Sequence, residues 1–327
     1  MGSPSRPRRV GRSTLEQRLA ELFGAAGCDA FLHVLDVDAG GEVAFDADAI
    51  VVSASVFKVS VALEFFRQVA AGELDATERV RVDPQKSLGA PAGLSLFRDE
   101  VEVSLRDLAA SMLTVSDALA TDVLLQRVTV ERVNELTRSL GLAQTVVVDD
   151  ILSMFDSLAR ECGFAGWAEF ANHPWNEIDE AGIAHALELM RAARTCDPAR
   201  ANRTTPRETT GLLRAIWRDE AAPPEACAAV RALMAKQLQR QRIARGFSDS
   251  NVRFSGKTGT FGGTYRNEAG VVEFPDGGRY AVAIFTRAHA LYERQREIDD
   301  AIGTAAGLAV HELRASPLAG EDAPAQG

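Results

Sequence analysis

Residues 55–66 read Ser-Val-Phe-Lys-Val-Ser-Val-Ala-Leu-Glu-Phe-Phe, and this stretch decides more about the chain than any other. The apolar pattern of 59–66 predicts a helix that begins close to Ser55 and Lys58. Residues three apart on a helix share a face, so the Ser55 hydroxyl and the Lys58 amine point the same way. A lysine takes a proton from a serine only as the neutral amine, which requires burial or a neighbouring cation. A Ser-x-x-Lys is common by chance, so this pair predicts a nucleophile only together with other motifs.

Strand patterns lie at both ends of the chain. Residues 31–37 and 42–45 flank an Ala-Gly-Gly turn and predict a hairpin. A second strand block comes late in the chain, with a Pro-Asp-Gly-Gly turn before its last member, and it occupies 252–256, 268–274 and 279–286. Helical patterns at 13–27 and 293–313 flank the two blocks. We therefore expect one antiparallel sheet assembled from both ends of the chain.

Between the strand blocks, residues 56–240 are mostly helical by periodicity, for example 105–128 and 130–140. A sheet flanked by helices and interrupted by a helical segment predicts an α/β (α+β) fold: an antiparallel sheet flanked by helices, with an inserted all-helical lobe. We expect a single domain over 1–327 without internal repeats. Its parts are an α/β lobe at about 13–60 and 210–315, a helical lobe at about 61–209, and a disordered tail at 316–327.

Bulk composition excludes several classes of partner. The chain has 327 residues, of which 46% are apolar, which is enough for a sizeable core. Its net charge of -10 argues against nucleic acid or an anionic membrane, since both bind basic surfaces. No apolar run reaches the length of a membrane span. The basic start is followed by a capping pattern, Ser13 to Glu16, rather than by the apolar run of an export signal, so we expect a cytoplasmic protein.

The four cysteines are widely spaced and form no metal-binding pattern with histidine. They are Cys28, Cys162, Cys196 and Cys227. Small buried thiols are the favoured interpretation, and two disulfides are the alternative. We expect neither a cofactor nor a metal.

Two further motifs carry polar groups that could act in chemistry. Ser116-Asp117-Ala118 fits the start of a helix, or else a second hydroxyl that relays a proton between the nucleophile and a leaving group. Lys257-Thr258 is followed by Gly259 at the end of a predicted strand. The glycine would let a substrate approach the backbone, and the lysine and threonine would offer donors to a substrate carboxylate. Each motif alone could equally be an ordinary helix start or an exposed strand end.

Taken in order, Ser-x-x-Lys, Ser-Asp-x and Lys-Thr-Gly form the signature of penicillin-recognising serine enzymes. Over about residues 15–315 the chain resembles class A β-lactamases and the related penicillin-binding proteins. Gly72-Glu73-Leu74 resembles the family's Gly-Lys-Leu segment, and Asn202-Arg203-Thr204-Thr205-Pro206 resembles the end of its omega loop. Arg266, nine residues past Lys257 (266 − 257), stands where the family has a carboxylate-binding arginine.

The resemblance implies a role for each matching residue. Ser55 attacks a carbonyl carbon and is acylated, with its own N–H and that of Thr260 as the oxyanion hole. Lys58 is the base for acylation, its pKa lowered partly by Lys257 across the cleft. Ser116 passes the proton on to the leaving nitrogen or oxygen.

The resemblance also implies a substrate class. Lys257, Thr258 and Arg266 would hold a substrate carboxylate, with Gly259 and Thr260 beside the bound molecule. The expected partner is therefore a small molecule that carries a carbonyl group and a carboxylate.

Two departures from the family pattern limit this expectation. Ala118 replaces the asparagine whose amide contacts the acyl side chain, which predicts weaker or different substrate recognition. The pentapeptide Glu-x-x-Leu-Asn, whose Glu and Asn hold the hydrolytic water in the family, is absent. Counting back from Asn202 by the family's spacing reaches Leu189, beside Glu188. Glu188 is therefore the candidate for the deacylating base, although it falls on a predicted helix with Ala192 where the asparagine should be.

The segment between Ser116 and Asn202 is long, at 86 positions (202 − 116). Its extra part, about 150–198, is rich in aromatic residues: Phe164, Trp167, Phe170 and Trp175. An ordinary helical insertion with inward-packed aromatics is favoured. The alternative is a cap that reshapes the mouth of the site for a different acyl group.

The leading hypothesis is a β-lactamase-like serine hydrolase that forms an acyl-enzyme on Ser55 with amide or ester substrates. Loss of the general base should slow hydrolysis of the acyl-enzyme by about a hundred- to ten-thousand-fold, so β-lactam turnover should be weak. The alternatives are an acyltransferase or esterase of non-β-lactam substrates, a glutaminase, and a penicillin-recognising binding protein without turnover.

Overall fold

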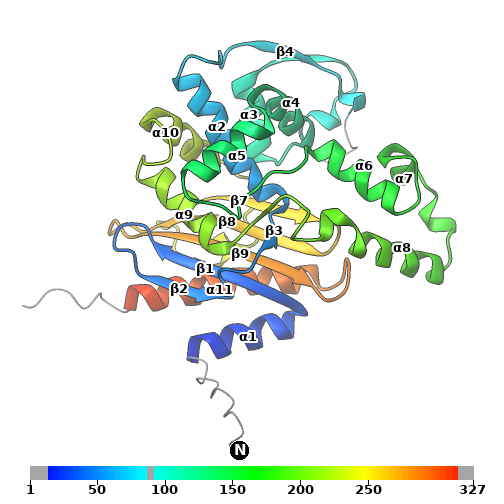
Figure 1. Ribbon diagram of the computed structural model, residues 1–327. Helices are drawn as coiled ribbons and strands as arrows, with labels where there is room; N and C mark the ends of the chain where they lie inside the picture. Colours follow the sequence, from blue (N-terminus) through cyan, green and yellow to red (C-terminus); the bar gives the residue numbers. More distant parts are fainter. Residues whose placement is uncertain (1–13, 87–91, 316–327) are drawn as a thin grey trace, which may run out of the picture.

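Five antiparallel strands form the main sheet of the computed structural model, which describes residues 14–86 and 92–315 (Figure 1). Their spatial order is β2-β1-β9-β8-β7, so the N-terminal hairpin joins the C-terminal block through the pairing of β1 with β9. They are β1 (Cys28–Asp36), β2 (Glu42–Phe45), β7 (Arg253–Phe261), β8 (Tyr265–Glu273) and β9 (Arg279–Ala288). The predicted α/β class, with its antiparallel sheet flanked by helices, is confirmed.

Strand β7 runs further than its sequence pattern predicted. The apolar pattern stops near Gly256, but the β7–β8 ladder continues to the pair Phe261 and Tyr265. Lys257 and Thr258 are both buried even though their side chains are polar. The apolar pattern underestimates the length of β7, because buried polar side chains take the place of apolar ones at Lys257 and Thr258.

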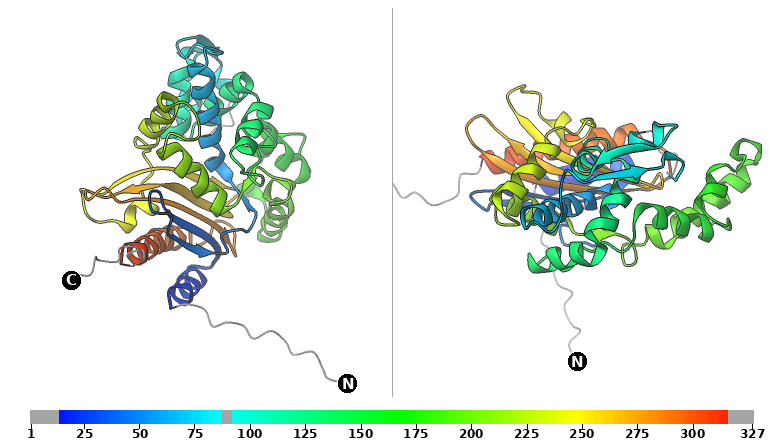
Figure 2. Two further views of the ribbon diagram at one scale, coloured as in Figure 1. Left: turned by 60° about the vertical axis from the view of Figure 1, so that its left-hand side comes forward. Right: turned by 90° about the horizontal axis from the view of Figure 1, so that it is seen from above.

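Helices cover both faces of the sheet (Figures 1 and 2). On one face lie α1 (Thr14–Ala26) and α11 (Gln295–Ala315), which bury Leu19, Phe23 and Ile302 against the sheet. The opposite face is covered by α9 (Pro206–Trp217), which contacts β1 and β9. The boundary expected at residue 210 thus falls inside a helix that packs on the sheet.

Helix α2 (Lys58–Ala70) stands at the centre of the helical part, and Val61, Leu63 and Phe65 on it are fully buried. Around it lie α3 (Leu105–Thr114), α4 (Ala118–Val128), α5 (Val130–Ser139) and α10 (Pro224–Met234). The single helix expected at 105–128 is in fact two helices. Ser116, with a positive φ of 62°, breaks it, and the Asp117 side chain then caps α4.

Smaller elements complete this part of the fold. Two short ribbons escaped the sequence analysis: β4 (Arg79–Val82) with β5 (Val101–Ser104), and β3 (Val51–Val52) with β6 (Arg203–Thr204). Single 3-10 turns are η1 (Ala54–Phe57), η2 (Pro84–Lys86), η3 (Gly93–Leu96), η5 (Arg194–Cys196) and η6 (Ile243–Gly246). Strand β3 leads directly into the segment that carries Ser55.

The insertion at about 150–198 forms a helical arm beside the rest of the molecule (Figure 2). It contains α6 (Ile151–Glu161), α7 (Trp167–Ala171), η4 (Trp175–Glu177) and α8 (Glu180–Ala192). Phe170 lies against three aromatic rings, with centroid distances of 5.1 Å to Phe164, 5.2 Å to Trp167 and 4.9 Å to Trp175. The aromatics therefore pack inward, in a core that also contains Ala54 beside Ser55 and Phe261 of β7.

Three other expectations concern the chain as a whole. All four cysteines are buried and free, and burial raises the pKa of Cys28 to about 12. Within 14–86 and 92–315, no helix combines the length and apolar character needed to cross a membrane. Ser13 and the expected disordered tail at 316–327 lie outside the described residues.

Candidate active site

Ser55 lies on η1, the 3-10 turn between β3 and α2. The turn is anchored from behind, because both the backbone N–H and the hydroxyl of Ser53 donate to the carbonyl of Asn202, each at 2.9 Å. Ala54 adopts a positive φ of 45°, which costs a non-glycine residue backbone energy. The Ser55 side chain is half-buried, and its hydroxyl forms no hydrogen bond within the described part of the chain. The nucleophile candidate is thus held by its backbone while its hydroxyl remains available.

Strand β7 runs directly against this turn. A Cβ atom placed on Gly259 would lie 2.9 Å from the Ser53 carbonyl oxygen and 3.1 Å from both the Ala54 Cβ and the Ser55 nitrogen. Only glycine therefore fits at this position. The sequence analysis expected the glycine to admit a substrate. In the structure, the group that approaches Gly259 is the chain's own nucleophile turn.

Two lysine side chains converge on Ser116. The Lys58 amine donates to the Ser116 carbonyl at 2.7 Å and to its Oγ at 3.2 Å. The Lys257 amine donates to the same Oγ at 3.0 Å and to the Thr258 carbonyl at 2.8 Å. Lys58 follows Ser55 by one helical turn, so the three predicted motifs meet around one hydroxyl.

Burial controls the charge of both lysines. Lys58 is 1% exposed and Lys257 is fully buried. Desolvation lowers the pKa of Lys58 to about 8, against a weaker opposing pull from the carboxylates of Asp122 and Asp117. Desolvation, and then the charge of Lys58, hold the pKa of Lys257 well below its usual range. Burial is thus the main cause of the low pKa of Lys58, and the part expected of Lys257 stays a prediction.

The conformation of Ser116 is fixed by its neighbour Asp117. One Asp117 oxygen accepts the N–H of Leu94 at 2.8 Å and the hydroxyl of Ser111 at 2.7 Å, and the other accepts the N–H of Ala120 at 3.1 Å. A buried carboxylate held by three donors is a rigid anchor. It keeps Ser116 in its strained backbone conformation between the two lysines.

The groups expected to bind a carboxylate lie close together but are engaged with the protein itself. Thr258 donates its N–H to the side-chain oxygen of Gln237 at 2.5 Å and its hydroxyl to that of Gln239 at 2.6 Å. Arg266 lies opposite Thr260 in the β7–β8 ladder, and its guanidinium pairs with Asp299. None of these side chains is directed at empty space.

Sequence reasoning missed a second arginine at this place. The Arg242 guanidinium is 1% exposed and donates to Asp299 at 2.7 Å, to the carbonyls of Gly259 at 3.0 Å and Asn267 at 2.6 Å, and to the hydroxyl of Thr260 at 2.7 Å. It therefore holds the end of the Lys-Thr-Gly strand more closely than Arg266 does. Arg242 belongs to none of the three motifs, so the sequence gave no signal of this role.

A family model described as the beta-lactamase enzyme family matches residues 14–313, almost all of the described chain. The chain belongs to the beta-lactamase enzyme family.

Relatives place this member of the beta-lactamase enzyme family among proteins of different roles. It is 30% identical over 305 residues to the beta-lactamase regulatory protein BlaB of Streptomyces cacaoi, covering 88% of this chain and 93% of that one. A beta-lactamase of Sphaerobacter thermophilus is 22% identical, with a TM-score of 0.70 over 93% of this chain and 98% of that one. A mutant of PBP-A, solved as an acyl-enzyme complex with penicillin G, is 20% identical with a TM-score of 0.70 over 93% and 97%.

The two departures from the beta-lactamase pattern lie at different places in the structure. Ala118 opens α4 directly after Asp117 and is half-buried, beside the lysines but without a polar group. Glu188 lies on α8 with an exposed side chain that has no hydrogen-bond or ion-pair partner among the described residues. The structure therefore does not bring Glu188 into the cluster around Ser116.

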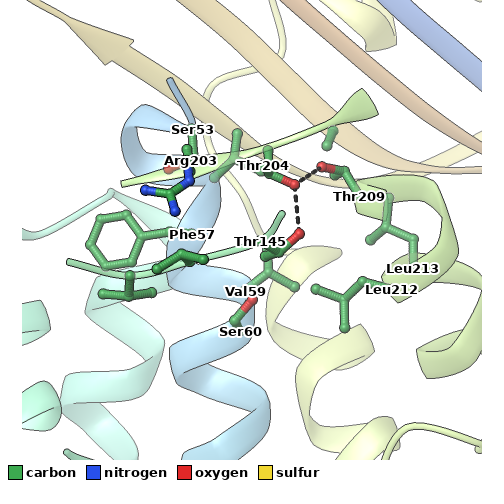
Figure 3. A pocket seen from close by; sticks show the side chains of 14 residues that line it. Ser53, Phe57, Val59, Ser60, Thr145, Arg203, Thr204, Thr209, Leu212 and Leu213 are labelled. Atoms are coloured by element: carbon green, nitrogen blue, oxygen red, sulfur yellow. Dashed lines mark hydrogen bonds between the residues drawn. The ribbon is translucent and has the colours of Figure 1, made fainter. Parts of the chain in front are cut away.

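A small cavity lies beside the start of α2 (Figure 3), and neither Lys58 nor Ser116 lines it. Its walls come from the start of α2, the Thr145–Val147 segment, β6 and α9, and Thr204 bridges the hydroxyls of Thr145 and Thr209 there. With a volume of about 20 Å³ it has room for little more than one water molecule. It is a packing defect of the beta-lactamase-like core and not a substrate pocket.

Proposed function

We propose that this protein is an active-site-serine hydrolase that forms an acyl-enzyme on Ser55 with a small amide or ester, including β-lactams. The observation that carries this proposal is the position of the Ser116 hydroxyl, which lies 3.2 Å from the Lys58 amine and 3.0 Å from the Lys257 amine. Lys58 itself follows Ser55 by one helical turn. A structural serine has no need for two buried amines. Such a cluster is expensive to bury, and proton transfer is the chemistry that it serves.

The steps of acylation follow from this arrangement. Neutral Lys58 accepts the proton of the Ser55 hydroxyl while Oγ attacks the carbonyl carbon. The negative charge on the carbonyl oxygen would be stabilised by the N–H groups of Ser55 and Thr260. The Ser116 hydroxyl then gives its proton to the leaving nitrogen or oxygen and regains one from a lysine beside it. Acyl transfer to Ser55 is thereby complete, with the leaving group neutral.

The low pKa of Lys58 supports its role as base. With a pKa of about 8, a tenth or so of the amine is neutral at pH 7, against less than a thousandth for an ordinary lysine. The carboxylate that the substrate would carry could accept the hydroxyl proton of Thr260, whose oxygen in turn accepts from the Arg242 guanidinium at 2.7 Å.

Hydrolysis of the acyl-enzyme is the less well equipped half of the reaction. Glu188 is exposed on α8. The buried Glu268, whose charge acts on Lys257, already accepts from the Gln237 amide at 2.9 Å and from the Ile243 N–H at 2.5 Å. The acylated state should therefore persist. A second candidate function follows from this: a protein that is acylated by a β-lactam and signals in that state. The Streptomyces cacaoi relative is named a beta-lactamase regulatory protein, which favours this candidate.

One experiment separates the two functions. The full chain is mixed with a chromogenic cephalosporin, and absorbance is recorded together with intact mass. Sustained colour development with little adduct supports a hydrolase, whereas one equivalent of colour with a lasting adduct supports an acylated sensor. Absence of an adduct with both the cephalosporin and a fluorophosphonate contradicts the assignment of Ser55.

A further inference from the structure

The insertion and the loop between β9 and α11 enclose a pocket that is much larger than the cavity beside α2. Its volume is about 420 Å³, against about 20 Å³ for that cavity, and it falls within the range of pockets that hold small molecules. No step of the reaction proposed above uses this pocket. Its walls include Phe170 of α7, Trp175 of η4, Leu187 and Met190 of α8, and Leu291 and Tyr292 of the loop.

The lining of this pocket favours an apolar ligand. The ring N–H of Trp175 already donates to the Phe170 carbonyl at 3.0 Å. Apart from the Tyr292 hydroxyl, the other side chains that line the pocket are hydrocarbon or, at Met190, a thioether. A charged ligand would lose its water here without gaining hydrogen bonds, whereas an apolar ligand gains free energy from burial. The pocket therefore suits a hydrocarbon chain.

The pocket lies at the end of the strand that passes Ser55. The carbonyl of Gly263, in the turn between β7 and β8, accepts the Tyr292 N–H at 3.1 Å, and a Cβ atom added to Gly263 would lie 2.7 Å from the Tyr292 ring. Gly259, four positions earlier, lies against the Ser55 nitrogen. Four residues of chain span at most about 14 Å, so the pocket wall and the nucleophile turn contact the same short piece of β7 and its turn.

The pocket and the turn that carries Ser55 belong to one packed unit. Phe170 and Met190 of the pocket wall are buried in a common core. Ala54, next to Ser55, and Phe261 at the end of β7 belong to the same core. Dense packing of this kind fixes the insertion relative to the nucleophile. The two residues that follow Phe261 are glycines, so this turn adds no side chain that would obstruct a ligand passing along it.

The loop that closes one side of the pocket is strained. Tyr292 and Arg294 have positive φ angles of 59° and 48°, although neither is a glycine. Such conformations cost free energy and persist where the surrounding structure imposes them, often at ligand sites. Here the strained backbone places the Tyr292 ring, which is 55% exposed, against Gly263 and beside the pocket. A ligand in the pocket would cover this exposed ring.

We propose that this pocket binds the apolar tail of the acyl group that Ser55 accepts, and that the substrates are amides or esters of long, unbranched acyl chains. The proposal rests on the proposed function, since the chain would be attached to Ser55. An extended chain gains at most about 1.2 Å per bond, so about twelve bonds cover the roughly 14 Å between Gly259 and Gly263. Chains of about twelve carbons or more therefore reach the pocket, and shorter chains do not.

The test uses p-nitrophenyl esters of unbranched acids, from the acetate to the palmitate, at concentrations below micelle formation. The Ser55 Oγ bonds to the ester carbonyl carbon, the bond from that carbon to p-nitrophenol breaks, and the serine proton leaves with the phenol. Absorbance and intact mass follow the first turnover. Each methylene that enters the pocket should raise the acylation rate about fourfold, so the palmitate should react on the order of a hundredfold faster than the octanoate.

Two variants on α8 locate the effect. Ala186 lines the pocket, so Ala186→Phe should fill it and abolish the preference for the palmitate over the octanoate. Ala184 is exposed on the same helix and is not part of the lining, so Ala184→Phe is the matched control and should keep the preference of the unaltered protein. A ratio of two rates measured in one protein does not depend on how much of the protein is folded. A folding defect therefore cannot imitate loss of the pocket.

The outcomes are distinguishable from failure of the proposed function. Adducts on Ser55 that form at the same rate with every ester overturn the role of the pocket and leave acylation intact. The same conclusion follows if Ala186→Phe retains the preference for the palmitate, or if both phenylalanine variants lose it. If none of the esters forms an adduct on Ser55, the proposed function and the inference that rests on it are both overturned.

Discussion

The Nζ of Lys257 lies 3.0 Å from the Oγ of Ser116. Lys58 approaches the same oxygen from the other side at 3.2 Å, and both amines are buried. Two ammonium ions so close together, without water to screen them, repel each other strongly. The arrangement is stable because at least one amine can give up its proton, and a neutral amine beside a serine is a base. The position of Ser116 thus links the charge state of the lysines to the reactivity of Ser55.

The pH dependence of acylation follows from the Lys58 amine. Because its pKa is about 8, the neutral fraction falls about tenfold for each pH unit below that value. The rate of adduct formation should therefore rise with pH and level off above about pH 8. Stopped-flow measurement with a chromogenic cephalosporin checks this. A flat profile between pH 5 and pH 9 would show that Lys58 is not the base.

Replacing Lys58 separates catalysis from stability. Lys58→Met keeps the length of the side chain and should slow acylation by about a hundred- to ten-thousand-fold. In the unaltered protein the folded-state pKa is lowered from 10.5 to about 8, so between these values the unfolded state binds more protons and stability increases with pH. The rise of the free energy of unfolding with pH should be smaller in Lys58→Met, because this variant lacks the amine that titrates. Urea unfolding at pH 7.5 and pH 10.5 measures it, and equal pH dependence in both proteins would contradict the burial of a charged amine.

The close approach at Gly259 predicts a specific defect. In Gly259→Ala the new Cβ would lie 2.9 Å from the Ser53 carbonyl oxygen, so the nucleophile turn must move away from β7. We expect a loss of about 1–3 kcal/mol in stability and a larger loss in the acylation rate, because the proposed oxyanion hole takes one N–H from each of these two segments. Gly24→Ala in α1 is the control, since no atom lies within 4 Å of its added Cβ. If Gly259→Ala were acylated at the normal rate, the reaction would not depend on the contact between β7 and the turn that carries Ser55.

The buried Arg242 should matter for folding. Arg242→Ala leaves two carbonyl groups and the Thr260 hydroxyl without their donor and removes one partner of a buried ion pair, at a cost of about 3–5 kcal/mol. The exposed Arg240, whose bond to the Phe254 carbonyl is 3.4 Å long, provides the control. Its replacement by alanine should change stability by less than about 0.5 kcal/mol. Denaturant midpoints that do not differ between the two variants would contradict the role of Arg242.

Much of the fold could be predicted because its signals are local. Alternating strands at both ends and the Ser-x-x-Lys, Ser-Asp-x and Lys-Thr-Gly motifs indicated the sheet and the residues that meet at Ser116. A helix start at Ser116-Asp117-Ala118 was one interpretation of that motif, but the positive φ of Ser116 leaves no trace in hydrophobic periodicity and could not be predicted. Likewise the polar end of β7 did not resemble a strand, since its buried lysine and threonine serve the site.

The remaining features depend on contacts between distant parts of the chain. Arg242 acts through partners that lie 17 to 57 positions away, and a single sequence gives no sign of such pairs. Glu188 was proposed by counting along the chain, and this failed as a guide to position because the aromatic insertion changes the spacing. Gly259 was singled out for the approach of a substrate, and the segment of the chain that approaches it could be identified only in three dimensions.

Locating the adduct tests the central claim most directly. The full chain and Ser55→Ala are incubated with penicillin G, their intact masses are measured, and the modified peptide is sequenced by mass spectrometry. We predict an increase equal to one intact penicillin molecule, located on Ser55 and absent from Ser55→Ala. An adduct on another residue, or one that forms equally in Ser55→Ala, would contradict the account.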